Sequence, residues 1–446
     1  MTADQLRQDA NLILQASLKA VDPYAAVKAA LNLSGDQLRV GGHSLDLARF
    51  ERIIAVGAGK AGAPMAQALE DVLGPRLMAG RVVVKDEHTA PTQVVELYEA
   101  SHPVPDERGV AAGRKLAELL AAHADPRTLV FCLLSGGGSA LMVAPAEGVS
   151  LADKQATTRL LLACGADIGE INAIRKHLSQ LKGGGLARLA HPAQVVSLIV
   201  SDVVGDRLDV IASGPTVGDS STWAEVASIL DRYQIRAQAP APVRARLEAG
   251  LAGAAPDTPK PGQPDLAGVI NLVVASNYQA LEAAAAEARR LGYAPLILSS
   301  SIEGETKDVA RLHAALAQEV RRSGHPLAAP CCLISGGETT VNLGQDFGLG
   351  GRNQEFALAA APDLKGLAGV LVLSAGTDGT DGPTDAAGAM ADGETLARGL
   401  AQGLSARAHL DRHDAHPYFK ALGDLIITGP TRTNVMDVRL VLVAKS

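Results

Sequence analysis

Short, uninterrupted apolar runs recur along the chain, and stretches with helical spacing separate many of them. Runs of this kind, rich in β-branched residues, are typical of strands buried on both faces of a parallel sheet. The intervening stretches are rich in Ala, Leu, Glu and Arg. This alternation predicts an α/β fold. The predicted strands cover residues 52–56, 81–85, 129–134, 195–200, 270–275, 295–298, 331–334, 369–373 and 438–443, and the clearest helices cover 62–73, 107–122, 279–291 and 305–322.

The 446-residue length favours two domains, at roughly 100–200 residues for each. Pro and Ala dominate residues 236–268, and helical periodicity fades after 250. We interpret this stretch as an exposed connection between an N-terminal lobe, 1–250, and a C-terminal lobe, 265–446. The last strand could return to the first lobe, so the two lobes need not be sequential.

The composition narrows the classes of function. Apolar residues make up 47% of the chain, which allows an ample core, and the net charge of −7 argues against a general nucleic-acid binder. The four cysteines have no zinc-site spacing, and three of them, Cys132, Cys331 and Cys332, adjoin apolar runs as small buried hydrophobes would. No apolar run approaches the ~18 residues of a membrane span, and the N-terminus lacks a signal-peptide pattern. We expect a cytoplasmic protein with a small-molecule ligand, compatible with a homo-oligomer.

Small and acidic polar residues cluster where the predicted strands end. Examples are VGAGKAG, LLSGGGSA, LIVSDVVGD, LISGGETT and LSAGTDGTDG. In open α/β sheets, ligands bind outside the carboxyl ends of the strands. The pattern therefore predicts an enzyme whose site is assembled from several strand-end loops.

The first of these loops matches GxGxxG at Gly57–Gly62, between a strand and a helix. That context favours a dinucleotide pyrophosphate, with Asp86 after the next strand as the ribose-binding acid. Lys60 is unusual there, because a cation at a helix N-terminus is unfavourable unless an anion accompanies it. We interpret Lys60 as a phosphate or carboxylate ligand, with an exposed lysine as the alternative. No P-loop is present.

Two Ser-Gly turns follow strands and resemble each other, in residues 131–140 and 331–340. Consecutive backbone N–H groups in such turns form anion-binding nests. The resemblance is explained either by convergence on a generic turn or by two related lobes that serve one cleft. The candidate binding residues are Ser135, Gly136, Gly137, Gly138 and Ser139 in the first turn, and Ser335, Gly336, Gly337 and Thr339 in the second.

Charged residues near other strand ends complete the candidates. Strand-end carboxylates suit Mg²⁺, although they also serve as helix caps and turn formers. The metal candidates are Asp202, Glu338 and Asp378. Arg352, after two glycines, can direct its guanidinium into a cleft. The cations of 175–182, with Arg175 and Lys182 as candidates, form either an anion-binding wall or a solvated helix face, and a lone histidine such as His102 is more often structural.

Eight motifs in order resemble one known family. They are VGAGKAG, SHPVPDERG, LLSGGGSALM, RKHLSQLKGGGLA, SDVVGD with ASGPTVGD, LISGGETTV, GGRNQEFALA and SAGTDGTDGPTDAAGA. Together they resemble the glycerate 2-kinase family, which has an N-terminal DUF4147-type region and a C-terminal MOFRL region, here about 330–440. The resemblance runs from about residue 8 to the C-terminus.

The resemblance implies ATP-dependent phosphorylation of D-glycerate at its 2-hydroxyl, a reaction for which we expect Mg²⁺ as the metal. It implies two α/β lobes around a deep cleft, and the strand pattern predicts that they are Rossmann-like with mainly parallel sheets. The family's GAGKA lysine and GGRNQE arginine correspond to Lys60 and Arg352, which the residues already favoured. Asn353 and Glu355 lie in the same motif and are further binding candidates, and Asp202 is the candidate base.

Two other functions remain open at this stage. GxGxxG with Asp86 fits an NAD(P)H-dependent hydroxypyruvate reductase, a name that members of the family often carry. A single GxGxxG motif does not explain why the second lobe also has turns of the kind that bind phosphate. A non-enzymatic module that binds sugar acids is the third hypothesis.

Overall fold

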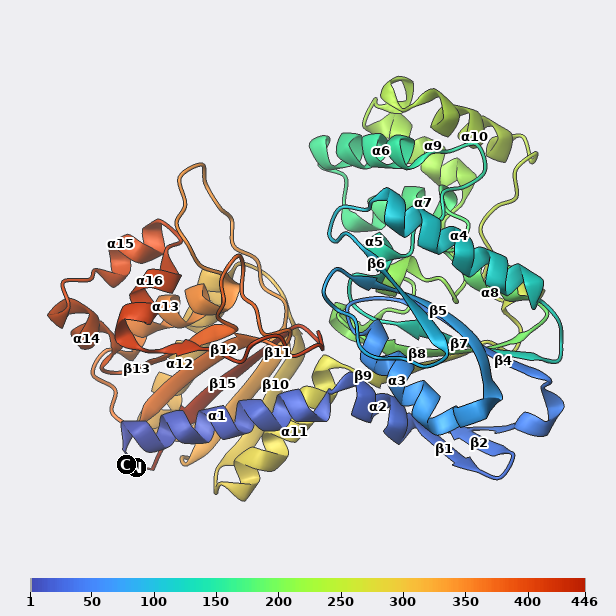
Figure 1. The fold of residues 1–446 in the computed structure, drawn as a ribbon. Coiled ribbons are helices and arrows are strands. Elements are labelled where there is room, and N and C mark those ends of the chain that lie inside the picture. Colours follow the sequence, from blue (N-terminus) through green and yellow to red (C-terminus); the bar gives the residue numbers. More distant parts are fainter. Residues whose placement is uncertain (1, 446) are drawn as a thin grey trace. The chain divides into compact units, whose positions relative to one another are not determined.

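The computed structural model describes residues 2–445, which divide into two compact units (Figure 1). The N unit comprises residues 23–201 and 206–274, and the C unit comprises 2–22, 202–205 and 275–445. The division differs from the expected lobes 1–250 and 265–446 in two respects. The first helix belongs to the C unit, and the proline-rich stretch lies within the N unit.

The central sheet of the N unit has the order β6-β5-β4-β7-β8-β9. Neighbours from β6 to β8 pair in parallel, as the apolar runs predicted. The order reverses between β4 and β7, and ligands bind at such a switch point in doubly wound sheets. The strands are β4 (Arg52–Ala58), β5 (Leu77–Lys85), β6 (Val95–Ala100), β7 (Thr128–Leu134), β8 (Gln194–Val200) and β9 (Ile270–Ala275).

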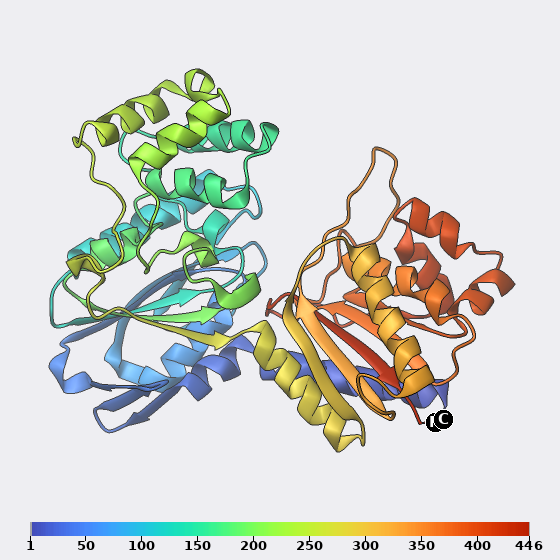
Figure 2. The same ribbon diagram turned by 180° about the vertical axis from the view of Figure 1, so that it is seen from behind.

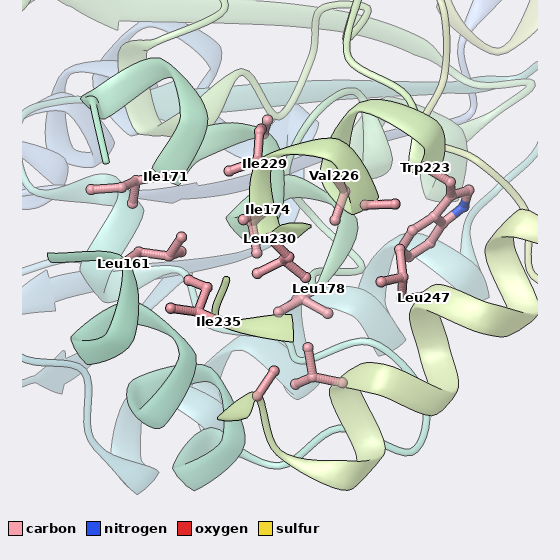
Figure 3. Close-up of a cluster of buried hydrophobic side chains, with 14 of the residues drawn as sticks. Leu161, Ile171, Ile174, Leu178, Trp223, Val226, Ile229, Leu230, Ile235 and Leu247 are labelled. Atoms are coloured by element: carbon pink, nitrogen blue, oxygen red, sulfur yellow. The ribbon is translucent and has the colours of Figure 1, made fainter. Parts of the chain in front are cut away.

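Helices surround this sheet and also build a separate layer with its own core. Trp223, Leu161 and Leu230 belong to that buried apolar cluster, which draws on α6, α7, α9 and α10 (Figure 3). The helices are α2 (Pro23–Ala30), α3 (Gly62–Leu73), α4 (Glu107–Ala122), α5 (Gly138–Leu141), α6 (Leu151–Ala163), α7 (Ile168–His177), α8 (Gly185–Ala190), α9 (Trp223–Arg232) and α10 (Ala241–Leu251). A small antiparallel sheet contains β1 (Leu31–Ser34), β2 (Gln37–Val40) and β3 (His43–Asp46).

The proline-rich stretch packs onto the N unit. Helix α10 inserts Val243 and Leu247 into the cluster of Figure 3. Beyond it, Thr258 Oγ1 donates to Asp219 at 2.9 Å, and the Asp219 amide donates to Pro259 O at 2.8 Å. These contacts explain why residues 236–268 belong to the N unit and do not form a separate connection between the lobes, although many of them are exposed.

The sheet of the C unit has the order β10-β11-β15-β12-β13-β14. Only the β10–β11 pair is parallel, so the expectation of a mainly parallel second sheet is wrong. The C-terminal strand inserts between β11 and β12 and runs antiparallel to both. The strands are β10 (Ala294–Ile302), β11 (Cys331–Gly337), β12 (Val370–Gly376), β13 (Gly388–Asp392), β14 (Leu425–Ile426) and β15 (Asp437–Val443).

Helices cover both faces of the C-unit sheet. Helices α1 and α11 pack together on one face, and α12 and α13 cover the other (Figures 1 and 2). Helix α1 joins this unit because its apolar stripe packs on α11, and Asp9 Oδ2 accepts from Tyr293 Oη at 2.7 Å. The helices are α1 (Ala3–Ala20), α11 (Asn277–Arg290), α12 (Thr306–Ser323), α13 (Arg352–Leu364), α14 (Thr395–Ala401), α15 (Ala406–Asp411) and α16 (Ala415–Leu422).

The cysteines and the longest helices bear on two of the expectations from the sequence. Cys132, Cys331 and Cys332 are buried, as their apolar surroundings predicted, while Cys164 is partly exposed. Among residues 2–445, no helix is both long enough and apolar enough to cross a membrane.

Candidate functional site

The loops after β4 and β7 pack tightly against each other at the switch point of the N-unit sheet. Gly57 and Gly59 permit this approach, because a Cβ on them would lie 2.2 Å from Leu133 O and 2.1 Å from Ser135 Oγ. Gly59 also has a φ of +144°, a conformation that side chains rarely adopt. Because these two positions carry no side chain, the ends of β4 and β7 can approach this closely.

The backbone N–H groups that a dinucleotide pyrophosphate would need already form hydrogen bonds within the protein. The N–H groups of Gly59, Lys60 and Ala61 donate to Val83 O (3.0 Å), Gly136 O (2.8 Å) and Ser135 Oγ (3.0 Å). Asp86, the expected ribose acid, forms a bidentate pair with Arg108 at 2.7 and 2.9 Å. Both features of the dinucleotide interpretation are therefore engaged in contacts within the protein.

The turn after β7 leads directly into α5 and lies beside Lys60 and His102. Gly137 has a φ of +82°, and a Cβ on it would lie 2.9 Å from His102 Cδ2 and 3.6 Å from Lys60 Cγ. Partial burial, with the nearby charges of Lys60 and Lys85, lowers the pKa of His102 to about 4. His102 is therefore a neutral imidazole at pH 7, packed against the candidate anion-binding turn.

Lys182 and Arg175 lie close to this turn, as the anion-wall interpretation requires. Lys182 Nζ donates to Ser139 O at 2.7 Å and to Ser139 Oγ at 2.8 Å. Burial and the charges of Lys154 and Arg175 lower the pKa of Lys182. Burial also lowers the pKa of Arg175. These cations are close enough to repel one another, and an anion would relieve that repulsion.

The other two basic residues of the RKH sequence do not join this wall. Lys176 pairs with the buried Asp219 at 3.2 Å, and His177 Nε2 lies 2.9 Å from Asp257 Oδ1. Sequence reasoning missed Lys154, whose Nζ donates to Leu178 O at 2.9 Å, because nothing in its local pattern marks it. Only the fold brings α6 alongside α7.

In the C unit, the register of β15 places a carboxylate where two strands end. Asp437 is opposite both Gly337, the last residue of β11, and Gly376, the last residue of β12. The carboxylate is fully buried and accepts from Arg352, Asn353 and Arg439. Asp437 therefore organises the polar centre of this unit.

Arg352, the first residue of α13, is fixed by two carboxylates. Its Nε and Nη2 donate to Asp437 at 2.8 and 2.9 Å, and its Nη1 lies 3.1 Å from Glu338 Oε1. Burial alone would lower the pKa of Arg352, but Asp437 and Glu338 raise it above its ordinary value. The guanidinium is thus held in one orientation with a permanent charge.

Sequence reasoning also missed Asp437 and Arg439. Arg439 is fully buried, donates to Asp437 Oδ2 at 2.8 Å and to Gly336 O at 3.1 Å, and lies over the Phe356 ring. Burial lowers its pKa despite the Asp437 charge. One signal was available, since Arg439 interrupts the apolar run VRLVLV two residues after Asp437.

The neighbours of Arg352 have mainly structural contacts. Asn353 Nδ2 donates to Asp437 at 2.9 Å, and Glu355 Oε2 lies 2.8 Å from His413 Nδ1. Asp381 accepts from the amides at the start of α13, and its pKa is raised, chiefly by burial. Asp378 accepts from the Thr380 amide in a local turn.

The turn after β11 is largely enclosed. Ser335, Gly336, Gly337 and Thr339 are buried, while Glu338 is exposed. Thr339 Oγ1 accepts from Arg439 and from Thr306. A helix, α5, begins directly after the turn that follows β7, but no helix begins at the turn that follows β11. Residues 131–140 and 331–340 therefore resemble each other only in the strand and its glycines.

The candidate metal ligands do not gather into one cluster. Among residues 2–445, no group of three or more His, Cys, Asp or Glu side chains is placed to hold a metal ion. Mg²⁺ in phosphoryl-transfer sites is usually held by one or two carboxylates together with substrate phosphates and water. The donors present fit that arrangement, with Asp202, Glu338 or Asp378 as the carboxylate, and do not fit an all-protein cage.

His313 is expected to make the stability of the C unit sensitive to acid. Its Nδ1 lies 2.7 Å from Val309 O and its Nε2 lies 2.7 Å from Ser335 Oγ, and burial lowers its pKa to about 4. Between pH 6.5 and 4 the unfolded chain binds a proton that the folded chain does not, so stability falls as the pH falls. We expect His313 to account for a loss of about 3 kcal/mol over that window.

Chemical unfolding of the wild type and of His313→Gln at pH 7 and pH 4.5 measures this effect. The variant should lose less unfolding free energy on acidification than the wild type. His325→Gln, a change at an exposed histidine of the same unit, is the control. Equal acid sensitivity of all three proteins would contradict the assignment.

Comparison with known proteins agrees with this architecture. The family model described as a domain of unknown function, DUF4147, matches residues 9–248, and the MOFRL family model matches residues 331–437. A D-glycerate 2-kinase of Thermotoga maritima is 41% identical, over 99% of both chains. A crystal structure of a glycerate kinase from that organism has a TM-score of 0.89 at 40% identity, covering 99% of this chain and 100% of the other. A protein of Agrobacterium vitis named as a hydroxypyruvate reductase is 47% identical over 88% of this chain and 87% of its own.

The fold and its sites define a two-unit α/β protein with fixed cations at strand ends in each unit. The comparisons confirm the resemblance of the eight motifs. The chain belongs to the glycerate 2-kinase family, with its DUF4147 and MOFRL regions.

Proposed function

We propose that this protein is a glycerate 2-kinase that transfers the γ-phosphate of ATP to the 2-hydroxyl of D-glycerate, giving 2-phosphoglycerate and ADP. The observation that carries the proposal is similarity over nearly the whole chain to enzymes of that name. The cations at the strand ends supply a chemical reason, because both substrates are anions. We place the reaction in the cytoplasm.

Lys60 and Arg352 carry the main catalytic roles in this proposal. Phosphoryl transfer depends chiefly on positioning and on stabilisation of charge at the transferring group. The two cations neutralise the glycerate carboxylate and the phosphoryl group. Asp437 acts through Arg352, since it binds Nε and Nη2 and so fixes the plane of the guanidinium.

Asp202 and the metal complete the proposed chemistry. Asp202 follows β8 and is the candidate base that accepts the proton of the 2-hydroxyl. Asp202, Glu338 or Asp378 would supply the protein ligand of a Mg²⁺ ion bound with ATP, and the ion would neutralise phosphate charge. The turn from Ser135 to Ser139 contributes further donors to substrate oxygens.

The reductase alternative receives less support from the geometry. The amides of Gly59, Lys60 and Ala61 already donate within the protein, and Asp86 is paired with Arg108. A nicotinamide dinucleotide would have to break these contacts to bind in the usual way.

A coupled assay tests the proposal. MgATP and D-glycerate are supplied with enolase, pyruvate kinase, lactate dehydrogenase and NADH, without phosphoglycerate mutase. We expect NADH oxidation, because enolase accepts 2-phosphoglycerate directly. A signal only after mutase is added would assign phosphorylation to the 3-hydroxyl instead. NADH loss with hydroxypyruvate alone, in a separate reaction without lactate dehydrogenase and with no kinase signal, would establish the reductase.

A further inference from the structure

The N unit contains a cavity of about 430 Å³ next to the turn after β7. Its walls come from the loop at 102–105, the turn at 137–140, α6, Arg175 and Lys182. Ligand pockets for molecules larger than simple metabolites span about 300–1,000 Å³. A three-carbon acid such as glycerate would fill only a small part of this space.

The inner end of the cavity is cationic. Lys154, Arg175 and Lys182 all line it, and the lining contains neither aspartate nor glutamate. Within residues 2–445, none of the three forms an ion pair with a carboxylate, and Arg175 makes no hydrogen bond. Burial and the charge of Arg175 lower the pKa of Lys154 to about 7. Three basic groups held together without counter-charge favour a multiply charged anion, because its charge would stabilise their protonated forms.

The exposed side of the cavity carries two large apolar side chains, with the exposed Arg159 also in its lining. Val104 and Leu162 line it from opposite elements, the 102–105 loop and α6, and each is 62% exposed. Leu151 and Val143 continue the apolar lining inward. A flat aromatic group bound here would cover side chains that water now contacts.

We propose that this cavity binds the nucleotide, with the adenine at the Val104–Leu162 end and the phosphates at Arg175, Lys182 and Ser139. The cavity's size, its exposed apolar side chains and its group of basic residues match the size, the base and the phosphates of ATP. The phosphates would lie beside Gly137, the residue against which the stem of Lys60 packs. This inference rests on the proposed kinase function and assigns the phosphate donor to the N unit.

Two variants separate the ends of the cavity. Leu162→Glu places a charge at the adenine end, and Arg175→Gln removes one from the phosphate end. Ile168→Glu is the matched control, because Ile168 is 63% exposed and does not line the cavity. The probes are Mg²⁺ with a non-hydrolysable ATP analogue, and adenosine, each titrated by calorimetry into the intact protein.

Leu162→Glu should weaken binding of both probes about tenfold or more. Arg175→Gln should weaken the ATP analogue by about the same factor and leave adenosine unchanged. Steady-state kinetics should then show a raised KM for ATP with the KM for D-glycerate within about twofold. The control should match the wild type.

Unchanged binding of the analogue in both variants would overturn the assignment. A raised KM for D-glycerate with unchanged analogue binding would overturn it as well, and would indicate that the cavity binds D-glycerate. The titrations contain no acceptor, so they test the cavity even if the coupled assay fails. Failure of the proposed function and failure of this inference are therefore distinguishable.

Discussion

Arg352→Ala is expected to lower kcat for glycerate phosphorylation by about 10³-fold or more. The guanidinium is locked by Asp437 through Nε and Nη2, with Nη1 directed to the exposed Glu338. An arginine held in this way stabilises developing phosphoryl charge without reorganising during the reaction. The same coupled assay measures the loss.

Arg352→Lys distinguishes charge from geometry. Lysine keeps the positive charge but lacks the planar fork, so we expect it to recover only a small part of the lost activity. Arg311→Ala, a change at an exposed arginine of the same unit, is the control for nonspecific effects. A loss below about tenfold for Arg352→Ala, in a protein with unaltered circular dichroism, would remove Arg352 from the mechanism.

Asp437→Asn is expected to destabilise the C unit by about 3–5 kcal/mol. The carboxylate is fully buried between two strand ends, and it is the counter-charge of the fully buried Arg439. The amide has nearly the same shape but leaves the guanidinium without compensation, which is the costly case for a buried pair. Chemical unfolding of the wild type and the variant measures the difference.

A second substitution tests the cause of that loss. Replacing Arg439 by Met in the Asp437→Asn background removes the uncompensated charge and should restore part of the stability. It should not restore kcat, because Arg352 would still lack its anchor. Asp411→Asn, at an exposed carboxylate of the same unit, should change stability by less than about 1 kcal/mol. Equal losses in the single and double variants would show that packing, not charge, explains the effect.

Local patterns predicted much of this structure. The predicted helices 62–73 and 107–122 coincide with α3 and α4, and all nine predicted strands lie within or overlap observed ones. Lys60 and Arg352 were marked by their unusual places beside glycine-rich turns. These features can be predicted from the sequence because backbone preferences and amphipathic periodicity act over a few neighbouring residues.

Long-range pairing could not be predicted in the same way. A strand buried on both faces is a continuous apolar run whether its neighbours are parallel or antiparallel, so β15 carried no sign of its direction. For the same reason, the sequence did not show that α1 joins the C unit, or that residues 236–268 pack on the N unit.

By itself, then, the sequence determined the α/β class, the strand-end loops and the family. Tertiary structure alone decided which charges meet. Asp437 reaches Arg352 and Arg439 only because β15 inserts between β11 and β12, and Lys154 approaches Lys182 only because α6 packs beside α7. The physical reason is that burial and charge compensation depend on neighbours distant in the chain, while secondary structure depends mainly on neighbours in sequence.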